Sequence, residues 1–169
     1  MYFVKQDVFV NLFGTNLFYR IDRLLDWRNG TGMQLENSLA AIGSSGIFGH
    51  GFNKTPIYFP ESGTDFIFAV AGEELGFVGT VVIIILLFLI VIECLLIARK
   101  AKDLGGRLIC CGMATLVGFQ SFVNIGVATG LMPNTGIPLP FVSYGLTSLV
   151  SLYIGMGFVL NVGLQPKKY

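Results

Sequence analysis

The chain has 169 residues, of which 53% are hydrophobic and only 12% are charged. Its mean hydropathy of +0.72 is above that of a typical water-soluble domain, so the composition indicates a membrane protein. The formal net charge of +1, with no long basic run, excludes nucleic acid as a partner. Cys94, Cys110 and Cys111 lie in or beside apolar runs, at spacings that fit neither a metal site nor a disulfide framework.

Residues 1–76 come before any apolar run that is long enough to span a membrane. Apolar residues recur at helical spacing between Val8 and Leu25, which predicts an amphipathic helix at a surface or interface. Residues 26–64 are rich in glycine, and one short helix is expected around Gln34 to Ile42. We interpret 1–76 as one region, a helix followed by a large loop.

Three long apolar runs follow, at about 77–98, 109–131 and 141–164. Each can cross a hydrocarbon core of about 30 Å at about 1.5 Å per residue. The sequence therefore predicts an all-α, polytopic integral membrane protein with three transmembrane helices in residues 77–169. Basic residues after the first run, at 99–102, and after the third, at Lys167 and Lys168, predict cytoplasmic ends. Residues 1–76 and the loop 131–140 are then extracytoplasmic, and the C-terminus is cytoplasmic.

An extracytoplasmic segment as long as 1–76 normally follows a signal peptide or an earlier helix. The start, MYFVKQDVFV, has no long apolar core of the kind that a signal peptide needs. We therefore expect the chain to be the C-terminal portion of a larger protein.

Acidic residues stand just before the first apolar run. In YFPESGTDF, residues 58–66, Ser62 and Asp65 have the spacing of a helix cap, with the carboxylate in the first turn. The alternative, which is compatible with capping, is that Asp65 is a general base at the interface toward a substrate anchored in lipid. Glu73 lies about 12 Å further along a helix, and we expect Glu73 and Glu74 to be solvated or at the interface.

The second apolar run carries Gln120 and Asn124 one helical turn apart. Polar groups in hydrocarbon need partners, so this face is expected to look toward other helices or a wet cavity. The stretch 133–140 that follows contains three prolines and Gly136, which predicts a rigid loop. Ser143 then offers a hydroxyl where the third helix is expected to begin.

Three blocks of sequence are specific in their order and separation. They are SLAAIGSSGIFGHG at 38–51, FPESGTDFIFAVAGEELGFVG at 59–79 and NIGVATGLMPNTGIPLPFVSYG at 124–145. Through these blocks the chain resembles, from about Arg23 to Lys167, the SEDS family of shape, elongation, division and sporulation proteins, which includes RodA, FtsW and SpoVE. The resemblance implies a multi-pass protein of the bacterial plasma membrane. It implies a peptidoglycan glycosyltransferase that polymerises lipid II, with a class B penicillin-binding transpeptidase as its partner.

The resemblance also implies that Asp65 is the catalytic aspartate, which deprotonates the attacking sugar hydroxyl. Glu61 and Thr64 would support it, and Lys54, or Arg23 and Arg28, would supply positive charge for the lipid diphosphate. The substrate-binding or supporting candidates are, together, Glu61, Thr64, Lys54, Gln120, Asn124 and Ser143. No cofactor and no set of metal ligands is implied, and a divalent cation stays open.

The chain departs from the family pattern in three ways. Gly49-His50-Gly51 stands where the family usually has Gly-Lys-Gly, Leu146 stands where a second glycine is usual, and the family's earlier helices are missing. Two alternatives to the enzyme therefore stay open. One is a flippase for the lipid-linked precursor, whose path Glu93, Gln120 and Asn124 would line, and the other is an inactive, truncated chain that binds a partner.

Overall fold

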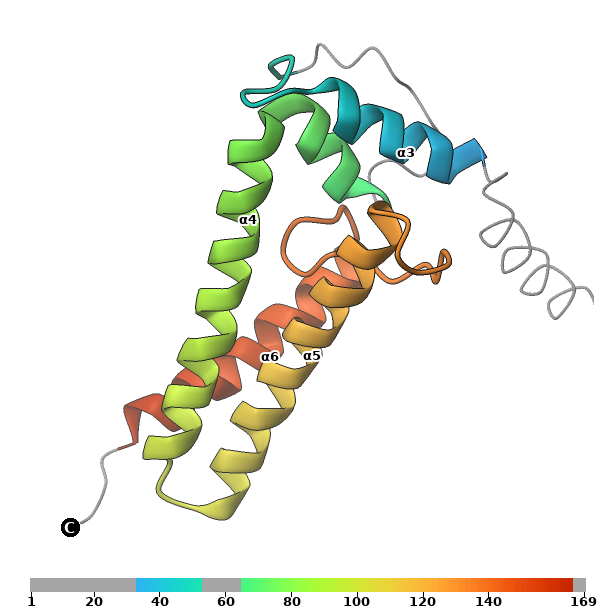
Figure 1. Ribbon diagram of the computed structural model, residues 1–169. Helices are drawn as coiled ribbons and strands as arrows, with labels where there is room; N and C mark the ends of the chain where they lie inside the picture. Colours follow the sequence, from blue (N-terminus) through green and yellow to red (C-terminus); the bar gives the residue numbers. More distant parts are fainter. Residues whose placement is uncertain (1–32, 53–64, 166–169) are drawn as a thin grey trace, which may run out of the picture.

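The structure, a computed structural model, describes residues 33–52 and 65–165 (Figure 1). The predicted helix from Val8 to Leu25 lies outside this part of the chain, as do Lys54, Glu61 and Thr64. The described residues form four helices and no strand: α3 (Met33–Ser44), α4 (Ile67–Lys100), α5 (Leu104–Ala128) and α6 (Leu146–Leu164). This confirms the all-α prediction, and α3 matches the short helix expected around Gln34 to Ile42.

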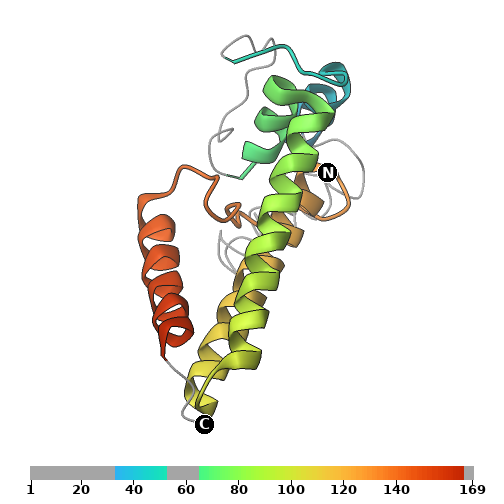
Figure 2. The ribbon, with the colours of Figure 1, turned by 90° about the vertical axis from the view of Figure 1, so that its left-hand side faces the viewer.

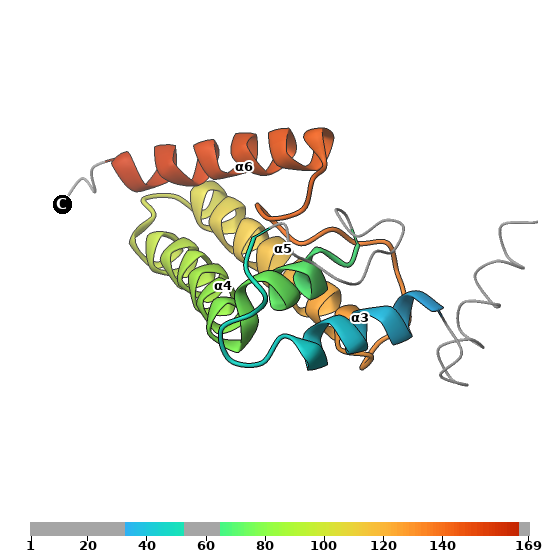
Figure 3. The ribbon, with the colours of Figure 1, turned by 90° about the horizontal axis from the view of Figure 1, so that it is seen from above.

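Helices α4, α5 and α6 are the three that are long and apolar enough to cross a membrane among the described residues. Helices α4 and α5 pack side by side, and α6 stands beside this pair (Figure 2). Viewed from above, α4 and α5 lie between α6 and α3 (Figure 3). The second long helix ends at Ala128 and the third begins at Leu146, because the prolines of 133–140 cannot continue a helix.

Helix α4 is broken at Gly76, whose φ of 69° and ψ of −166° are not helical. The residues after the break, 77–100, rise about 36 Å at about 1.5 Å per residue, enough to cross the hydrocarbon core without the first turns of α4. The break therefore coincides with the start of the predicted first span. A glycine is needed here because its φ lies in the left-handed region.

The break is held by the glycine-rich segment that follows α3. The backbone N–H groups of His50 and Gly51 donate to the carbonyl oxygens of Glu73 and Glu74, at 2.9 and 3.0 Å, on the near side of the break. On its far side, the N–H groups of Phe77 and Val78 donate to the carbonyls of Gly46 and Ile47, at 3.1 and 3.2 Å. These four bonds satisfy backbone groups that the interrupted helix leaves without helical partners. We call this arrangement of residues 46–51 and 73–78 the glycine latch.

Helix α3 crosses the end of the bundle at which α5 ends, which we call the α3 end (Figure 1). The fully buried Ser38 donates its hydroxyl to the carbonyl oxygen of Ala128, at 2.8 Å, in the last turn of α5. Phe66, just before α4, packs with Ala41 of α3 and with Val123 and Val127 of α5. Segments far apart in sequence therefore share one small core at the α3 end.

A second core lies toward the turn between α4 and α5. It contains Cys94, Ala98, Cys110, Ala114 and Val159, which come from all three long helices. Its side chains are small, so the helices approach closely here. This core fixes the long helices at the end opposite the site described next.

Candidate functional site

Asp65 lies at the α3 end, immediately before α4, and its side chain is half-buried. The predicted cap is wrong for α4: the helix begins at Ile67, and Phe66 is its N-cap residue with no side-chain hydrogen bond to the first turn. Ser62 itself lies outside the described residues, five positions before the first helical residue. The Asp65 carboxylate stands just outside the helix, in a turn whose next residue, Phe66, is 1% exposed.

Asn124 of α5 joins this turn to the rigid loop 133–140. Its side-chain amide donates to the carbonyl oxygen of Asp65, at 2.9 Å, and to that of Ile137, at 2.8 Å. Asn124 is 1% exposed, so both bonds form away from water. This bears out the expectation that the Asn124 face of α5 looks inward, and it shows that the partners are main-chain carbonyls.

The loop 133–140 brings Gly136 beside the carboxylate. A methyl group added at Gly136 would lie 3.7 Å from Asp65 Oδ2, and the φ of Gly136 is +70°. The Asn134 side chain shapes this turn, because its Oδ1 accepts a hydrogen bond from the Gly136 N–H, at 3.1 Å. Its amide also contacts Gln34 Oε1 of α3, at 3.4 Å. The loop is thus tied to α3, to α5 and to the Asp65 turn.

Ser143 organises the turn at the end of this loop. Its hydroxyl oxygen accepts a hydrogen bond from the Leu139 N–H, at 2.7 Å, and the residue is 5% exposed. Phe141, between them, has a φ of 62°, which is uncommon for a residue with a side chain and stores backbone strain. Its ring meets that of Tyr153 in α6 edge to face. Ser143 therefore supports the local backbone.

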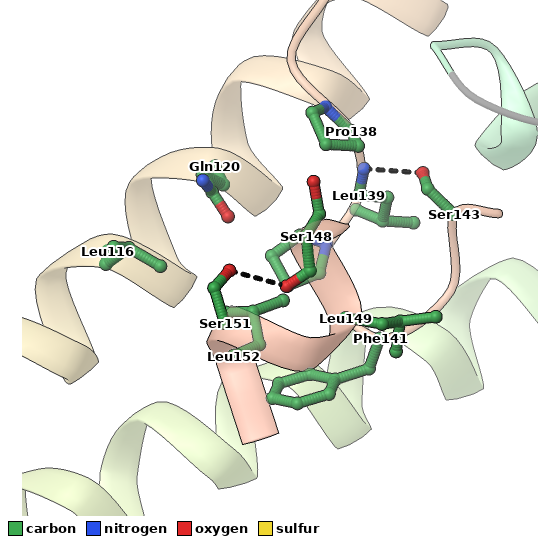
Figure 4. Close-up of a pocket in the computed structure, with 11 residues that line it drawn as sticks. Leu116, Gln120, Pro138, Leu139, Phe141, Ser143, Ser148, Leu149, Ser151 and Leu152 are labelled. Carbon is green, nitrogen blue, oxygen red and sulfur yellow. Dashed lines mark hydrogen bonds between the residues drawn. The ribbon is translucent and has the colours of Figure 1, made fainter. Parts of the chain in front are cut away.

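Gln120 and Ser143 also line a cavity of about 80 Å³ between α5, this turn and α6 (Figure 4). Ser148 and Ser151 of α6 face Gln120 across it, and Ser151 donates its hydroxyl to the Ser148 carbonyl, at 2.8 Å. A space of this size holds a few water molecules. The structure thus separates two candidates: Asn124 contacts the Asp65 turn, and Gln120 lines the neighbouring cavity.

Three further acids of the described residues, Glu73, Glu74 and Glu93, lie on α4. Glu73 was expected to be solvated or at the interface, and this is wrong, because Glu73 is fully buried. The glycine latch meets α4 at this residue and uses the Glu73 carbonyl as an acceptor. Glu74 is half-buried, while Glu93 is exposed on α4.

The three residues of the flippase alternative lie at different depths of the bundle. Glu93 lies seven residues before the end of α4 and Gln120 lies sixteen residues after the start of α5, so the two are about 14 Å apart along the helix axes. Asn124 is buried against main-chain carbonyls. Within the described residues, no three His, Cys, Asp or Glu side chains are grouped so as to hold a metal ion.

Sequence reasoning missed two features of the site. One is the contact between Gly136 and the Asp65 carboxylate, and the other is the bond from Asn124 to the Asp65 carbonyl. The sequence offers one signal for each feature. The glycine among the prolines of 133–140 is the signal for the first, and the expected inward orientation of Asn124 is the signal for the second. Both features depend on how α4, α5 and the loop pack together.

A broken membrane helix, with a carboxylate just before it and a rigid Pro/Gly loop beside that carboxylate, defines a polytopic membrane protein with a site at one end of its bundle. Residues 7–168 match the FtsW/RodA/SpoVE family, described as "Cell cycle protein". The chain belongs to this SEDS family, because the match covers almost all of its residues.

Relatives and solved structures agree with this assignment. The chain is 43% identical over 153 residues to "Probable peptidoglycan glycosyltransferase FtsW" of Bacillus subtilis, covering 89% of this chain and 38% of the relative. It is 40% identical over 172 residues to "Stage V sporulation protein E" of the same organism, covering 92% and 47%. The chain thus spans less than half the length of these relatives.

Two solved structures share the fold. One comes from work on "Structural coordination of polymerization and crosslinking by a peptidoglycan synthase complex", with a TM-score of 0.69 and 35% identity, and covers 95% of this chain and 45% of that one. The other is a variant of the Thermus thermophilus rod shape determining protein RodA, with a TM-score of 0.59 and 38% identity, covering 72% and 39%.

Proposed function

We propose that this chain is the C-terminal part of a peptidoglycan glycosyltransferase that polymerises lipid II, and that Asp65 is its general base. The relatives named as probable peptidoglycan glycosyltransferases support the reaction. One observation carries the assignment of the base. The Asp65 carboxylate is half-buried just before a membrane-spanning helix, and the residue facing it, Gly136, has no side chain to cover it.

The chemistry needs a base in this position. A sugar hydroxyl attacks the anomeric carbon of the lipid-linked sugar, the new glycosidic bond forms, and the bond to the lipid diphosphate breaks. Asp65 accepts the hydroxyl proton as this happens, and the diphosphate leaves as an anion. Lys54 is proposed to meet the diphosphate, and Glu61 and Thr64 to support Asp65. Ser143 shapes the loop beside the site.

The arrangement also suggests how the chain sits in the membrane. The basic residues at 99–102 and the lysines Lys167 and Lys168 favour a cytoplasmic location for the end opposite α3. The α3 end, with Asp65, then faces the outside of the bacterial plasma membrane, where lipid II is used. A class B penicillin-binding transpeptidase is the proposed partner, and the solved peptidoglycan synthase complex supports this pairing.

Polymerisation of labelled lipid II in detergent tests the proposal. Two purified proteins are compared: the chain itself, and a chimera in which the N-terminal helices of Bacillus subtilis FtsW precede it. We expect glycan strands from the chimera and none from its Asp65→Ala variant. Strands of undiminished yield from Asp65→Ala would rule out Asp65 as the base. The polymerisation activity of the chain alone shows whether its three spanning helices suffice or whether the chain is inactive by itself.

A further inference from the structure

Asn124 occupies a position that the proposed base alone does not explain. It is the residue of α5 that contacts both the Asp65 turn and the loop 133–140, through one side-chain amide. We propose that Asn124 is the positioning residue of this site. Asn124 holds the Asp65 backbone and the loop 133–140 at a fixed separation. The proposal rests on the proposed role of Asp65 as general base.

The hydrogen bonds of Asn124 show that it positions and does not bind. A side-chain amide has two N–H donors, and both are taken by main-chain carbonyl oxygens, at 2.9 Å for Asp65 and 2.8 Å for Ile137. Asn124 is 1% exposed, so a substrate on the surface does not reach it. Both N–H donors are therefore used in holding two segments of backbone, while Oδ1 is buried without a hydrogen-bond partner among the described residues. The effect of Asn124 on the reaction passes through these two segments.

Fixing the Asp65 carbonyl restricts where the carboxylate can go. The next residue, Phe66, is 1% exposed and packs in the core with Val123 and Val127 of α5. The main chain of the turn is thus held at the carbonyl by Asn124 and one residue later by the Phe66 ring. With the main chain held, the two side-chain torsions of Asp65 set the position of the carboxylate, which lies within a small volume next to Gly136.

The second bond of Asn124 sets the opposite wall of the site. Ile137 directly follows Gly136, so the Asn124 bond to the Ile137 carbonyl fixes the backbone that faces the carboxylate. Because a methyl group at Gly136 would come within 3.7 Å of Asp65 Oδ2, the width of the site depends on this backbone. Loss of the Asn124 amide removes one hydrogen bond from each wall at the same time.

Three variants of the chimera test this role in lipid II polymerisation. Asn124→Ala removes the side chain, and Asn124→Asp keeps its shape but presents acceptors to two carbonyl oxygens. The matched control is Ser121→Ala, one turn earlier in α5, where a buried hydroxyl bonds only to the Val117 carbonyl of its own helix. We expect both Asn124 variants to lower kcat by roughly ten- to a hundredfold, with KM for lipid II nearly unchanged, and Ser121→Ala to resemble wild type.

A geometric measurement separates positioning from general stability. Cysteines placed at Asp65 and Gly136, in a background whose native cysteines are replaced by alanine, are joined by a short bis-methanethiosulfonate cross-linker. Because the carboxylate and Gly136 adjoin each other, we expect efficient linking when Asn124 is present and clearly slower linking with Asn124→Ala. Ser121→Ala should leave the linking rate unchanged.

The outcomes of these experiments are distinct. If Asp65→Ala abolishes polymerisation while Asn124→Ala and Asn124→Asp keep the wild-type kcat, the positioning role is wrong and the proposed function survives. Equal cross-linking rates with and without Asn124 would also overturn it, whatever the activity. If Asp65→Ala itself polymerises normally, the failure lies in the proposed function, and the cross-linking result alone then decides whether Asn124 sets this geometry.

Discussion

The glycine latch gives the sharpest prediction for stability. Gly49 meets the backbone of Glu74 and Gly76 so closely that a methyl group on Gly49 would overlap their atoms, and the φ of Gly49 is +73°. Gly49→Ala must therefore push residues 46–51 away from the break in α4. The four backbone bonds of the latch would be weakened at the same time.

The cost follows from two contributions. A non-glycine residue in the left-handed region costs about 1–2 kcal/mol. If the overlap breaks two of the four latch bonds, at about 1 kcal/mol each, Gly49→Ala lowers the free energy of unfolding by about 3–4 kcal/mol in total. Gly46→Ala provides the matched comparison, because Gly46 has a φ of +62° with nothing within 4 Å. Gly46→Ala should lower the free energy of unfolding only by the backbone contribution, about 1–2 kcal/mol.

Thermal unfolding in detergent measures this difference. Cys94 and Cys110 are fully buried, so a thiol-reactive dye that fluoresces on labelling reports when the helices separate. We expect the Tm to fall by about 10 °C for Gly49→Ala and by about 4 °C for Gly46→Ala. Gly43→Ala, in α3 with open space around it, should be neutral or stabilising. A Gly49→Ala variant as stable as Gly46→Ala would refute the role of the latch.

Three further predictions concern single side chains. Ser38→Ala leaves the Ala128 carbonyl buried without its 2.8 Å bond and should destabilise the chain by about 1–3 kcal/mol in the same dye assay. Asp103→Ala removes the acceptor for the Gly106 N–H at the start of α5 and should lower the free energy of unfolding by about 1 kcal/mol. Lys102→Ala, the control, should leave the free energy of unfolding unchanged. Glu93→Gln, at an exposed position, should leave lipid II polymerisation unchanged, and a large loss would show that Glu93 contributes to the reaction.

The sequence predicts those parts of the fold that local patterns determine. The three apolar runs correctly predict the three long helices. The predicted start of the first run, at about 77, lies one residue after the break at Gly76. Prolines in 133–140 correctly indicated the loop between α5 and α6. In each case the decisive property, hydropathy or backbone conformation, is set within a short window of residues.

Contacts between distant segments could not be predicted in this way. Glu73 lies in a stretch that flanks a span, yet it is buried in the folded chain, where the glycine latch from another part of the sequence bonds to its carbonyl. The spacing of Ser62 and Asp65 matches a helix cap, yet α4 begins later, at Ile67. Phe66, just before it, packs against α3 and α5. Asn124 was expected to face inward, but its pairing with the Asp65 carbonyl needs α4 and α5 in place.

The measurement that tests the central claim most directly is lipid II polymerisation by the chimera with Asp65→Asn, which keeps the shape of the side chain and cannot act as the base. Glu93→Gln, a matching carboxylate-to-amide change at an exposed acid toward the other end of α4, is the control. The account predicts that Asp65→Asn makes no glycan strands while Glu93→Gln makes them at the wild-type rate. Strands from Asp65→Asn at the wild-type rate would contradict it.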